Sequence, residues 1–244
     1  MKYQYFENRN FEDLASGRVI YHQSGTPHFP VRLAGEIFMA CMEVLGKESG
    51  KAVLYDPCCG GAYMLTVLGF LCGHFIDAIY ASDISGKAVL LAKENLNLLH
   101  PQGLARRKAQ LEEMVLTYGK QSHTDAANSA DHLLGLLASQ SAPIDCTVFS
   151  ADMMDEAALA NAKFKADIVF TDVPYGDLST WSNGTAFAIH TLLSTIAPVL
   201  HDHSILAICS DKGQKITNPR FKRIRKIHVG KRKIELLAQH HGPI

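Results

Sequence analysis

The chain has 244 residues, of which 47% are hydrophobic and 20% charged, the balance of an ordinary soluble globular protein. No apolar run reaches the roughly 20 residues of a membrane span, and the N-terminus lacks the apolar core of a secretion signal. These features argue against a membrane or secreted protein. We therefore expect a cytoplasmic protein, large enough for an α/β domain with its own core.

The net charge of zero hides a strong asymmetry along the chain. Residues 1–211 carry 14 Lys and Arg against 23 Asp and Glu, a charge of −9, whereas residues 212–244 carry 10 against 1, a charge of +9. A cationic segment can simply be a solvated face. It can also bind a partner with a dense negative surface, and nucleic acid is the first candidate.

The cysteines and histidines give little sign of a metal site. Cys58 and Cys59 are adjacent, but the six cysteines form no CxxC pair and the histidines no HExxH motif. Small buried residues in a reducing compartment explain the cysteines better than redox or metal chemistry. We expect no metal.

Strand and helix patterns alternate after a lead-in, residues 1–30, that has no clear periodicity. Apolar residues at helical spacing predict an amphipathic helix over residues 33–45. Short apolar runs predict strands, and a glycine-rich turn separates the first strand from the next helix. In order, the following elements are a strand at 51–56, a helix at 63–73, a strand at 78–83 and a helix at 85–99.

The alternation resumes after a long connection at residues 100–143, whose composition predicts two helices. The later expected elements are strands at 146–152 and 167–172, a short helical stretch near 155–163, a helix at 185–199, a strand at 203–211, and a hairpin over 221–239 turning at Val229-Gly230. This pattern predicts one doubly wound, Rossmann-like α/β domain over residues 1–244. Its additions are an N-terminal extension and helix (1–46), the inserted helical pair (100–143) and a basic hairpin (212–239).

The glycine turn after the first strand reads Asp56-Pro57-Cys58-Cys59-Gly60-Gly61. It lets backbone N–H groups approach a ligand, yet it matches neither GxGxxG nor a P-loop. An acid at the end of the strand is a poor neighbour for a pyrophosphate but suits a cation. The turn therefore points away from NAD and ATP and toward S-adenosylmethionine, whose ammonium and sulfonium groups are both positive.

Two further acids follow strands. Asp83 ends the second strand, where acids of nucleoside-binding βαβ units accept hydrogen bonds from ribose hydroxyls. Asp152 follows the third, where an acid can meet an adenine amino group and Met153 or Met154 can supply an apolar wall. A helix cap at Asp83 and an ordinary loop acid at Asp152 are the alternatives.

The segment Asp172-Val173-Pro174-Tyr175 ends another strand and resembles the Asp/Asn-Pro-Pro-Tyr/Phe motif of amino-group nucleic-acid methyltransferases, with Val in place of the first Pro. A base nitrogen is a weak nucleophile, so a carboxylate that bonds its N–H and aligns it with a methyl group speeds transfer. Pro174 stiffens the loop, and the ring of Tyr175 or Trp181 can stack on a base taken out of its helix.

With these motifs the chain resembles class I S-adenosylmethionine-dependent methyltransferases and, more narrowly, the AviRa-type avilamycin-resistance rRNA methyltransferases. The likeness runs from "PVRLAGEIF" through "LYDPCCGGAYMLTVLG", "ASDISGKAVLLAKENLNLLHPQGL" and "DIVFTDVPYG" to "SDKGQKI". One departure lies in the turn, where Gly61-Ala62 stands in place of the family's Ser-Gly, and Ala is less permissive than Gly at positive φ.

The resemblance implies a seven-stranded, mostly parallel sheet with an antiparallel last strand, and methylation of a guanine nitrogen in large-subunit rRNA with resistance to orthosomycin antibiotics. It implies S-adenosylmethionine as cofactor, and the expected cofactor-binding residues are Asp56, Pro57, Cys58, Cys59, Gly60, Gly61, Asp83, Ile84, Asp152, Met153 and Asp172. Nothing in the sequence demands more than a monomer, which is the expected state. Asp172, Pro174 and Tyr175 would be catalytic.

The cations of the basic segment are expected to contact rRNA phosphates, extended by three in the insertion. The expected RNA-binding residues are Trp181, Lys212, Lys215, Arg220, Lys222, Arg223, Arg225, Lys231, Arg232, Lys233, Arg106, Arg107 and Lys108. Three other functions stay open: an amino methyltransferase for DNA or another RNA, such as an adenine-N6 enzyme, a small-molecule methyltransferase, and a non-catalytic RNA-binding module on this fold.

Overall fold

The computed structural model describes residues 3–15, 17–22, 28–47, 50–173, 185–230 and 232–240, without the side chains of 185–187. Seven strands form one sheet in the order β3-β2-β1-β4-β5-β7-β6. All neighbouring strands from β3 to β5 are parallel, and β7 runs antiparallel to both β5 and β6. The strands are β1 (Ala52–Asp56), β2 (Ile76–Asp83), β3 (Asp145–Ser150), β4 (Ala166–Asp172), β5 (Leu200–Asp211), β6 (Phe221–Val229) and β7 (Arg232–Gln239).

This sheet confirms the predicted fold class, including the antiparallel last strand and the hairpin. β1 is followed by β2 and β3 on one side and has β4 and β5 on the other, so the chain reverses its direction of travel between β1 and β4. Open α/β sheets bind their ligands at the carboxyl ends of the strands on either side of such a reversal.

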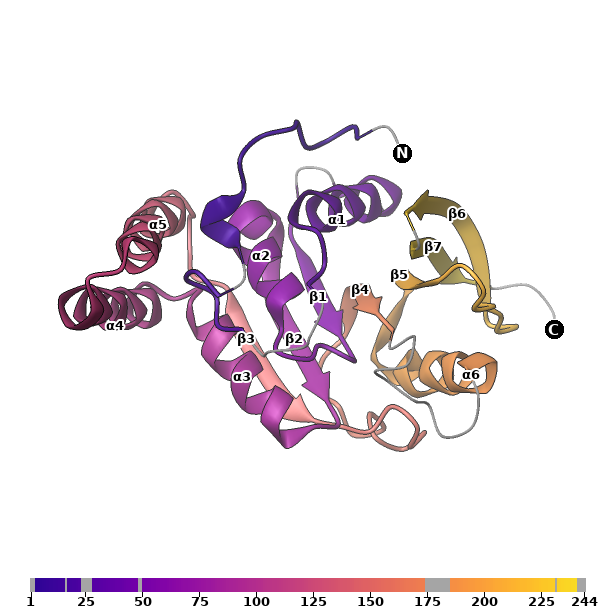
Figure 1. Ribbon diagram of the computed structural model, residues 1–244. Coiled ribbons are helices and arrows are strands. Elements are labelled where there is room, and N and C mark those ends of the chain that lie inside the picture. Colours follow the sequence, from indigo (N-terminus) through magenta and orange to yellow (C-terminus); the bar gives the residue numbers. More distant parts are fainter. Residues whose placement is uncertain are drawn as a thin grey trace.

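Helices cover both faces of the sheet (Figure 1). They are α1 (Val31–Leu45), α2 (Tyr63–Cys72), α3 (Gly86–Asn97), α4 (Pro101–Tyr118), α5 (Gln121–Ala138) and α6 (Thr185–Ile196), with 3-10 turns η1 (Glu12–Leu14), η2 (Gly73–Phe75) and η3 (Ala197–Val199). α1, α2 and α3 share one hydrophobic core with the sheet, and α6 shares the other. Because crossovers are right-handed, the reversal at β1 sends α2 and α3 to one face and α6 to the opposite face.

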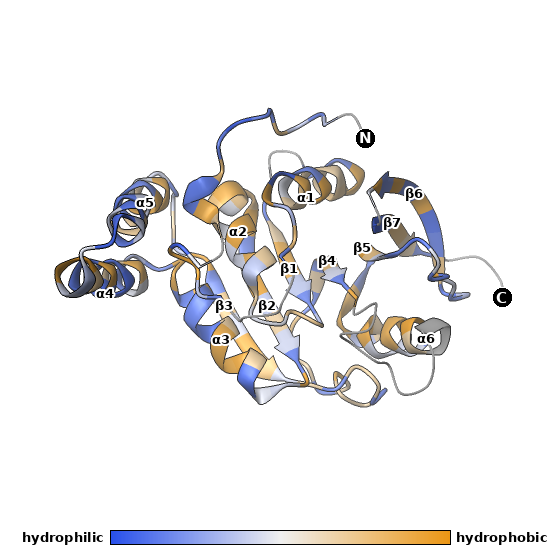
Figure 2. Ribbon diagram, viewed as in Figure 1, coloured by the Kyte–Doolittle hydropathy of each residue, from blue (hydrophilic) through white to orange (hydrophobic). Residues whose placement is uncertain are grey.

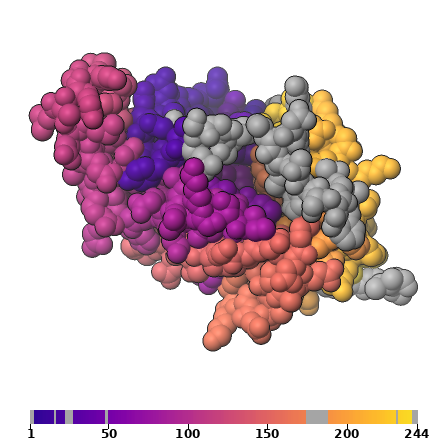
Figure 3. Space-filling view, turned by 60° about the horizontal axis from the view of Figure 1, so that its bottom comes forward, coloured from indigo at the N-terminus to yellow at the C-terminus, as the bar shows by residue number. Residues whose placement is uncertain are grey.

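The predicted insertion is the antiparallel pair α4 and α5, which projects from one side of the molecule, opposite the β6–β7 hairpin (Figures 1 and 3). Figure 2 shows mostly hydrophobic residues along α2, which lies in the core, and a mixture of both kinds along α4 and α5. Gly103 allows α4 to pack closely, since a Cβ there would lie 2.0 Å from the Asn97 carbonyl oxygen.

One expectation needs correction, and one segment has a role that the sequence did not indicate. Residues 155–163 form successive turns rather than a helix, and Phe164 closes them by stacking on Tyr80 with ring centroids 3.9 Å apart. The lead-in that lacks periodicity is part of the core, with Leu14, Val19 and Ile20 almost fully buried. An irregular segment can bury apolar side chains without any repeat, which is why its role could not be detected from periodicity.

Candidate active site

Three carboxylates meet at the carboxyl edge of the sheet, where Asp56 ends β1, Asp83 ends β2 and Asp172 ends β4. β1 lies between β2 and β4, and the parallel pairing brings the three strand ends to one edge. The sequence-based expectation that these acids share a site therefore agrees with their placement.

Asp56 is the most deeply placed of the three, with only 3% of its surface exposed. Burial raises the pKa of its carboxyl to about 7; the Cys58 N–H, 3.0 Å from Oδ1, opposes the rise, and the charges of Asp83 and Asp172 add to it. A buried acid beside two others is stabilised in its charged form by a cation. The site is thus electrostatically suited to a positively charged ligand.

The turn that follows β1 is fastened to the neighbouring strand. The N–H of Cys59 donates to the Ser82 carbonyl (2.9 Å), and the N–H of Gly60 donates to Oδ2 of Asp83 (2.9 Å). Gly60 has φ +52°, and a Cβ at this position would meet no atom within 4 Å. The glycine therefore serves the backbone conformation and leaves open space above the turn.

Gly61 and Ala62 complete the turn in different ways. A Cβ on Gly61 would lie 2.6 Å from Leu91, so the missing side chain lets the turn pack against α3. Asn95 of α3 donates to the Gly61 carbonyl (2.8 Å). Ala62 has φ 55°, alone among described non-glycine residues in having positive φ, and is buried. The departure noted in the sequence thus falls on a position with left-handed backbone conformation.

Asp83 is held by its surroundings, with Oδ1 accepting from the N–H of Ser85 (2.9 Å) and Oδ2 from Gly60. Ser85 also caps α3, as its Oγ accepts from Ala88 N. The next residue, Ile84, is 67% exposed. A fixed carboxylate beside an exposed apolar side chain is the combination that a nucleoside's ribose and base require.

Asp152 and Met153 differ from each other in position. Asp152 is exposed and accepts from the Met154 N–H (2.8 Å). Met153 is only 4% exposed, and its Sδ lies 3.9 Å from the Tyr55 hydroxyl in the core. The expectation that Met153 offers a ligand an apolar wall is therefore wrong, because the side chain packs inward; Met154 is half-buried.

Asp172 is half-buried and lies beside an arginine from the other end of the chain. Oδ2 of Asp172 is 3.7 Å from Nε of Arg232, the first residue of β7. The adjoining backbone is fixed, since the N–H of Val173 donates to the Cys209 carbonyl (3.0 Å). Pro174, Tyr175 and Trp181, the other predicted substrate contacts in this loop, lie outside the described residues.

The cysteines near this edge are unsuited to nucleophilic catalysis. Burial raises the pKa values of the Cys58, Cys59 and Cys209 thiols well above their ordinary range, and nearby carboxylates raise them further. A thiol with a raised pKa is protonated at neutral pH and is a poor nucleophile. Chemistry at this edge would therefore run through the carboxylates.

The predicted RNA-binding cations fall into three groups. Five are exposed around the hairpin: Lys212, Lys215, Arg220, Lys222 and Arg223. Lys226, also exposed on the edge strand β6, was missed, although it belongs to the same charge run. Arg106 of the insertion is also exposed, Lys231 lies outside the described residues, and the other predicted cations contact groups within the protein.

Two hairpin cations correct the sequence-based expectation. Lys233 is 4% exposed, donates to the Gln214 carbonyl and lies 3.2 Å from Glu235, so it cannot reach a phosphate in this arrangement. Arg232 is turned toward Asp172. Both belong to β7, an inner strand, where the charge count of the segment gives no hint of burial. Arg225 is paired with Glu43 of α1 at 3.1 Å.

The three cations of the insertion also differ. Arg107 lies over the Tyr21 ring, 4.2 Å from its centroid, and donates to the Val19 carbonyl (2.9 Å), so it fastens the N-terminal segment. Lys108 is paired with Asp131 at 2.7 Å and with Glu112. Arg106 is exposed. Contacts within the protein therefore engage both residues, Arg107 through a ring and a carbonyl and Lys108 through two carboxylates.

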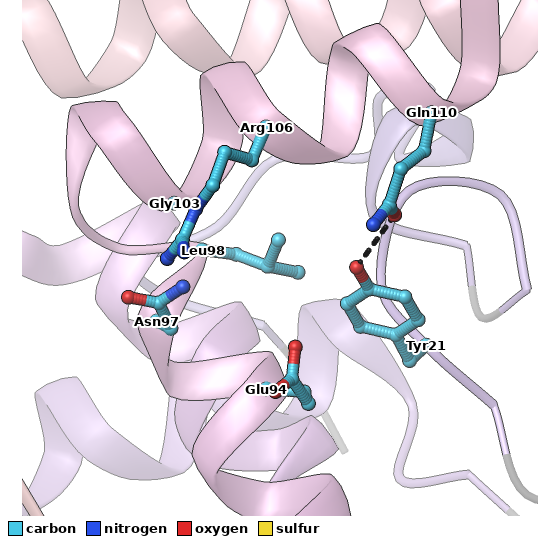
Figure 4. Close-up of a pocket in the computed structure, with 7 residues that line it drawn as sticks. All are labelled: Tyr21, Glu94, Asn97, Leu98, Gly103, Arg106 and Gln110. Carbon is cyan, nitrogen blue, oxygen red and sulfur yellow. Dashed lines mark hydrogen bonds between the residues drawn. The ribbon is translucent and has the colours of Figure 1, made fainter. Parts of the chain in front are cut away.

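Arg106 lines a small hollow of about 110 Å³ between α3, α4 and the N-terminal segment (Figure 4). The lining residues are Tyr21, Glu94, Asn97, Leu98, Gly103, Arg106 and Gln110. Across it, the Tyr21 hydroxyl donates to Oε1 of Gln110 (2.9 Å). Because α3 begins beside Asp83 and this hollow adjoins its other end, the hollow is separate from the carboxylate site.

The fold and the acidic carboxyl edge together define a class I methyltransferase. The likeness to the N-terminal domain of human METTL16 in complex with SAH, at TM-score 0.53 and 11% identity over 90% of this chain and 75% of that one, supports the fold. The family model for the rRNA methyltransferase AviRa matches residues 1–232. The chain therefore belongs to the AviRa family of rRNA methyltransferases.

Comparisons with a protein sequence and a solved structure from Streptomyces viridochromogenes agree with this family. The chain is 36% identical to its 23S rRNA (guanine(2535)-N(1))-methyltransferase over 95% of this chain and 93% of that protein. The solved structure of its rRNA methyltransferase AviRa matches with TM-score 0.85 and 34% identity, over 95% of this chain and 94% of that one. No helix in the described part of the chain is long and apolar enough to span a membrane.

Proposed function

We propose that this protein methylates N1 of a guanine in 23S rRNA, with S-adenosylmethionine as the methyl donor. The observation that carries the proposal is the meeting of Asp56, Asp83 and Asp172 at one sheet edge in a chain of the AviRa family. Guanine N1 as the target comes from the name of the 36% identical relative. Avilamycin-type resistance would be the consequence for the cell.

The cofactor site is inferred from the negative charge of its residues. Asp56 and the open turn at Gly60 would hold the cationic amino-acid part, and Asp83 with Ile84 the nucleoside part. The raised pKa of Asp56 supports this assignment, since a bound cation favours the carboxylate. When bound, S-adenosylmethionine supplies an electrophilic methyl group on a positively charged sulfur.

Asp172 would act on the target base, as proton acceptor and as positioning group. Guanine N1 carries a proton that must leave when a methyl group arrives, and a carboxylate at hydrogen-bond distance can accept it. Held at the end of β4, Asp172 would also fix the base in line for attack, an effect worth roughly 7–11 kcal/mol at ideal geometry. No covalent protein intermediate is required.

The test is transfer of labelled methyl to unmodified bacterial 23S rRNA, wild type beside Asp172→Ala, with digestion of the product to nucleosides. Label in 1-methylguanosine that disappears in the variant supports the proposal. Label in N6-methyladenosine or in DNA would favour an adenine enzyme, and label in small acceptors a small-molecule enzyme. RNA binding without cofactor binding would indicate a non-catalytic module.

A further inference from the structure

Arg232 occupies a position that its place in the basic segment did not suggest. β7 runs antiparallel to β5, with Arg232 opposite Asp211, and β4 runs parallel to β5, with Asp172 opposite Cys209. Side chains two residues apart on a strand point to the same face. Arg232 and Asp172 therefore reach over the same face of β5, and their side chains are 22% and 27% exposed.

The Arg232 side chain packs over an aromatic ring, but its Nε lacks a hydrogen-bond partner among the described residues. Its guanidinium carbon lies 5.4 Å from the centroid of the Phe29 ring, and Phe29 in turn makes an edge contact with Phe170. Nε of Arg232 is buried and makes no hydrogen bond within the described part of the chain. Its 3.7 Å separation from Asp172 is too long for a hydrogen bond. A buried donor in this condition calls for an explanation, and an acceptor on a bound ligand supplies one.

We propose that Arg232 is a second catalytic residue, which binds O6 of the target guanine while Asp172 binds N1–H. This inference rests on the proposed function. On the base edge, N1 and O6 are neighbours, one a donor and the other an acceptor, and on the protein a carboxylate and a guanidinium lie side by side. Arginine is the residue that most often donates to guanine O6.

The reaction makes use of both groups. The N1–H proton passes to Asp172, the N1 electron pair forms the new bond to the methyl carbon, and the electron pair of the broken carbon–sulfur bond stays on sulfur, giving S-adenosylhomocysteine. As the proton leaves, negative charge spreads from N1 onto O6. A guanidinium at O6 stabilises that charge, as donors do for oxyanions in other enzymes.

A phosphate contact, which the sequence suggested for Arg232, fits this position less well. A phosphate at Arg232 would lie beside the Asp172 carboxylate and be repelled as a like charge. The guanine edge instead offers an acceptor to the cation and a donor to the anion. The exposed cations of β6, Lys222 among them, have no acid in the site beside them and suit phosphates better.

The experiment compares Arg232→Gln with wild type on 23S rRNA across a range of pH and salt. We expect a roughly 100-fold lower rate at neutral pH, the usual effect of removing one oxyanion donor. The difference in rate between wild type and Arg232→Gln should become smaller as the pH approaches the range in which guanine N1 ionises without the enzyme. The titratable groups near Arg232 are Asp172, Asp211, Asp56 and Cys209, and all four are present in both proteins. Because loss of the guanidinium itself raises the pKa of Cys209, the pH profile is also compared with that of Arg232→Lys, which keeps a positive charge at this position. Lys222→Gln is the matched control, with a changed salt dependence and an unchanged pH profile.

Arg232→Lys keeps the charge and should recover part of the rate, provided that both variants keep the wild-type cofactor affinity and unfolding temperature. A second measurement changes the RNA. With 6-thioguanine at the target position, sulfur replaces O6 as a weaker acceptor, and the ratio of the wild-type rate to the Arg232→Gln rate should become smaller.

A deficit that is the same at every pH, together with a flatter salt dependence, would overturn the assignment in favour of a phosphate contact. If wild type itself yields no 1-methylguanosine, the proposed function fails instead, so the two failures are distinguishable.

Discussion

The carboxyl edge at β1 and β2 and the hairpin at β6 and β7 carry opposite charge and use it differently. At the first, Asp56 and Asp83 are held by backbone N–H groups, and burial shifts the pKa of Asp56. At the second, the cations divide by strand: β6 exposes Lys222, Arg223 and Lys226, whereas on β7 Arg232 is half-buried beside Asp172 and Lys233 is buried. Carboxylates fixed by hydrogen bonds are suited to one specific ligand, whereas exposed cations form a surface that attracts a polyanion.

The largest expected effect comes from Asp172→Asn, which removes the acceptor for the N1 proton. Loss of a positioned base lowers methyl transfer by about 10²–10⁴-fold. Isothermal titration should show that cofactor binding persists, since Asp56 and Asp83 are unchanged. The control is Asp145→Asn, an exposed acid at the opposite end of β3, which should transfer methyl at the wild-type rate. Equal losses in both variants would contradict a specific role for Asp172.

Asp56→Asn should separate stability from binding. The folded pKa of about 7 lies above the ordinary value of 3.8 for an aspartate, so the folded state holds this proton over a range where the unfolded state has lost it. Asp56 therefore stabilises the free protein least above pH 7, and the contribution falls as pH rises from about 4 to 7. The Asn variant should gain stability over wild type across that window, by about 1–4 kcal/mol at pH 8.

The same substitution removes a charged partner of the cofactor and should weaken its binding about ten- to a hundredfold. Urea unfolding at pH 5 and pH 8, with calorimetric titration of S-adenosylmethionine, measures both quantities. A variant that is less stable than wild type at pH 8 would show that the carboxylate is paired in the free protein. Unchanged cofactor affinity would remove Asp56 from the binding site.

The exposed edge strand offers a smaller effect. Lys222→Gln combined with Lys226→Gln should weaken rRNA binding several-fold at low salt. It should also reduce the slope of log K against log salt by about 0.7–0.9 for each lost phosphate contact. Lys93→Gln, an exposed cation on α3, is the control and should leave the slope unchanged. A double variant with the wild-type slope would show that the +9 segment is a solvated face.

The sequence was sufficient for the parts of the protein that follow local rules. Alternating strands and helices, the glycine turn and the acids at strand ends predicted the sheet and the positions of Asp56, Asp83 and Asp172. It could not predict the burial of Arg232 and Lys233, because they belong to the same run of cations as β6 and only the order of the strands in the sheet separates them. Phe29 was missed for a related reason, as its contacts with Phe170 and Arg232 join three distant segments.

The smallest expected effect concerns Ala62, the departure from the family's turn. Changing it to Gly relieves a left-handed conformation that costs about 1–2 kcal/mol. It also loses a buried methyl group, worth about 0.8 kcal/mol, and adds unfolded-state entropy of about 0.5–1 kcal/mol. These opposing terms leave Ala62→Gly within about 1 kcal/mol of wild type.

The neighbouring Gly61→Ala provides the contrast, since its Cβ would lie 2.6 Å from Leu91 and overpacking of this kind costs about 1–3 kcal/mol. Thermal unfolding ranks the two variants, and titration with S-adenosylmethionine shows whether the turn still binds. We expect Ala62→Gly to keep the wild-type cofactor affinity, because Asp56 and Asp83 hold the turn by hydrogen bonds that the change leaves intact. Tenfold tighter binding would instead mean that Ala62 holds the turn in a conformation that opposes the cofactor, so that charge alone does not set the affinity.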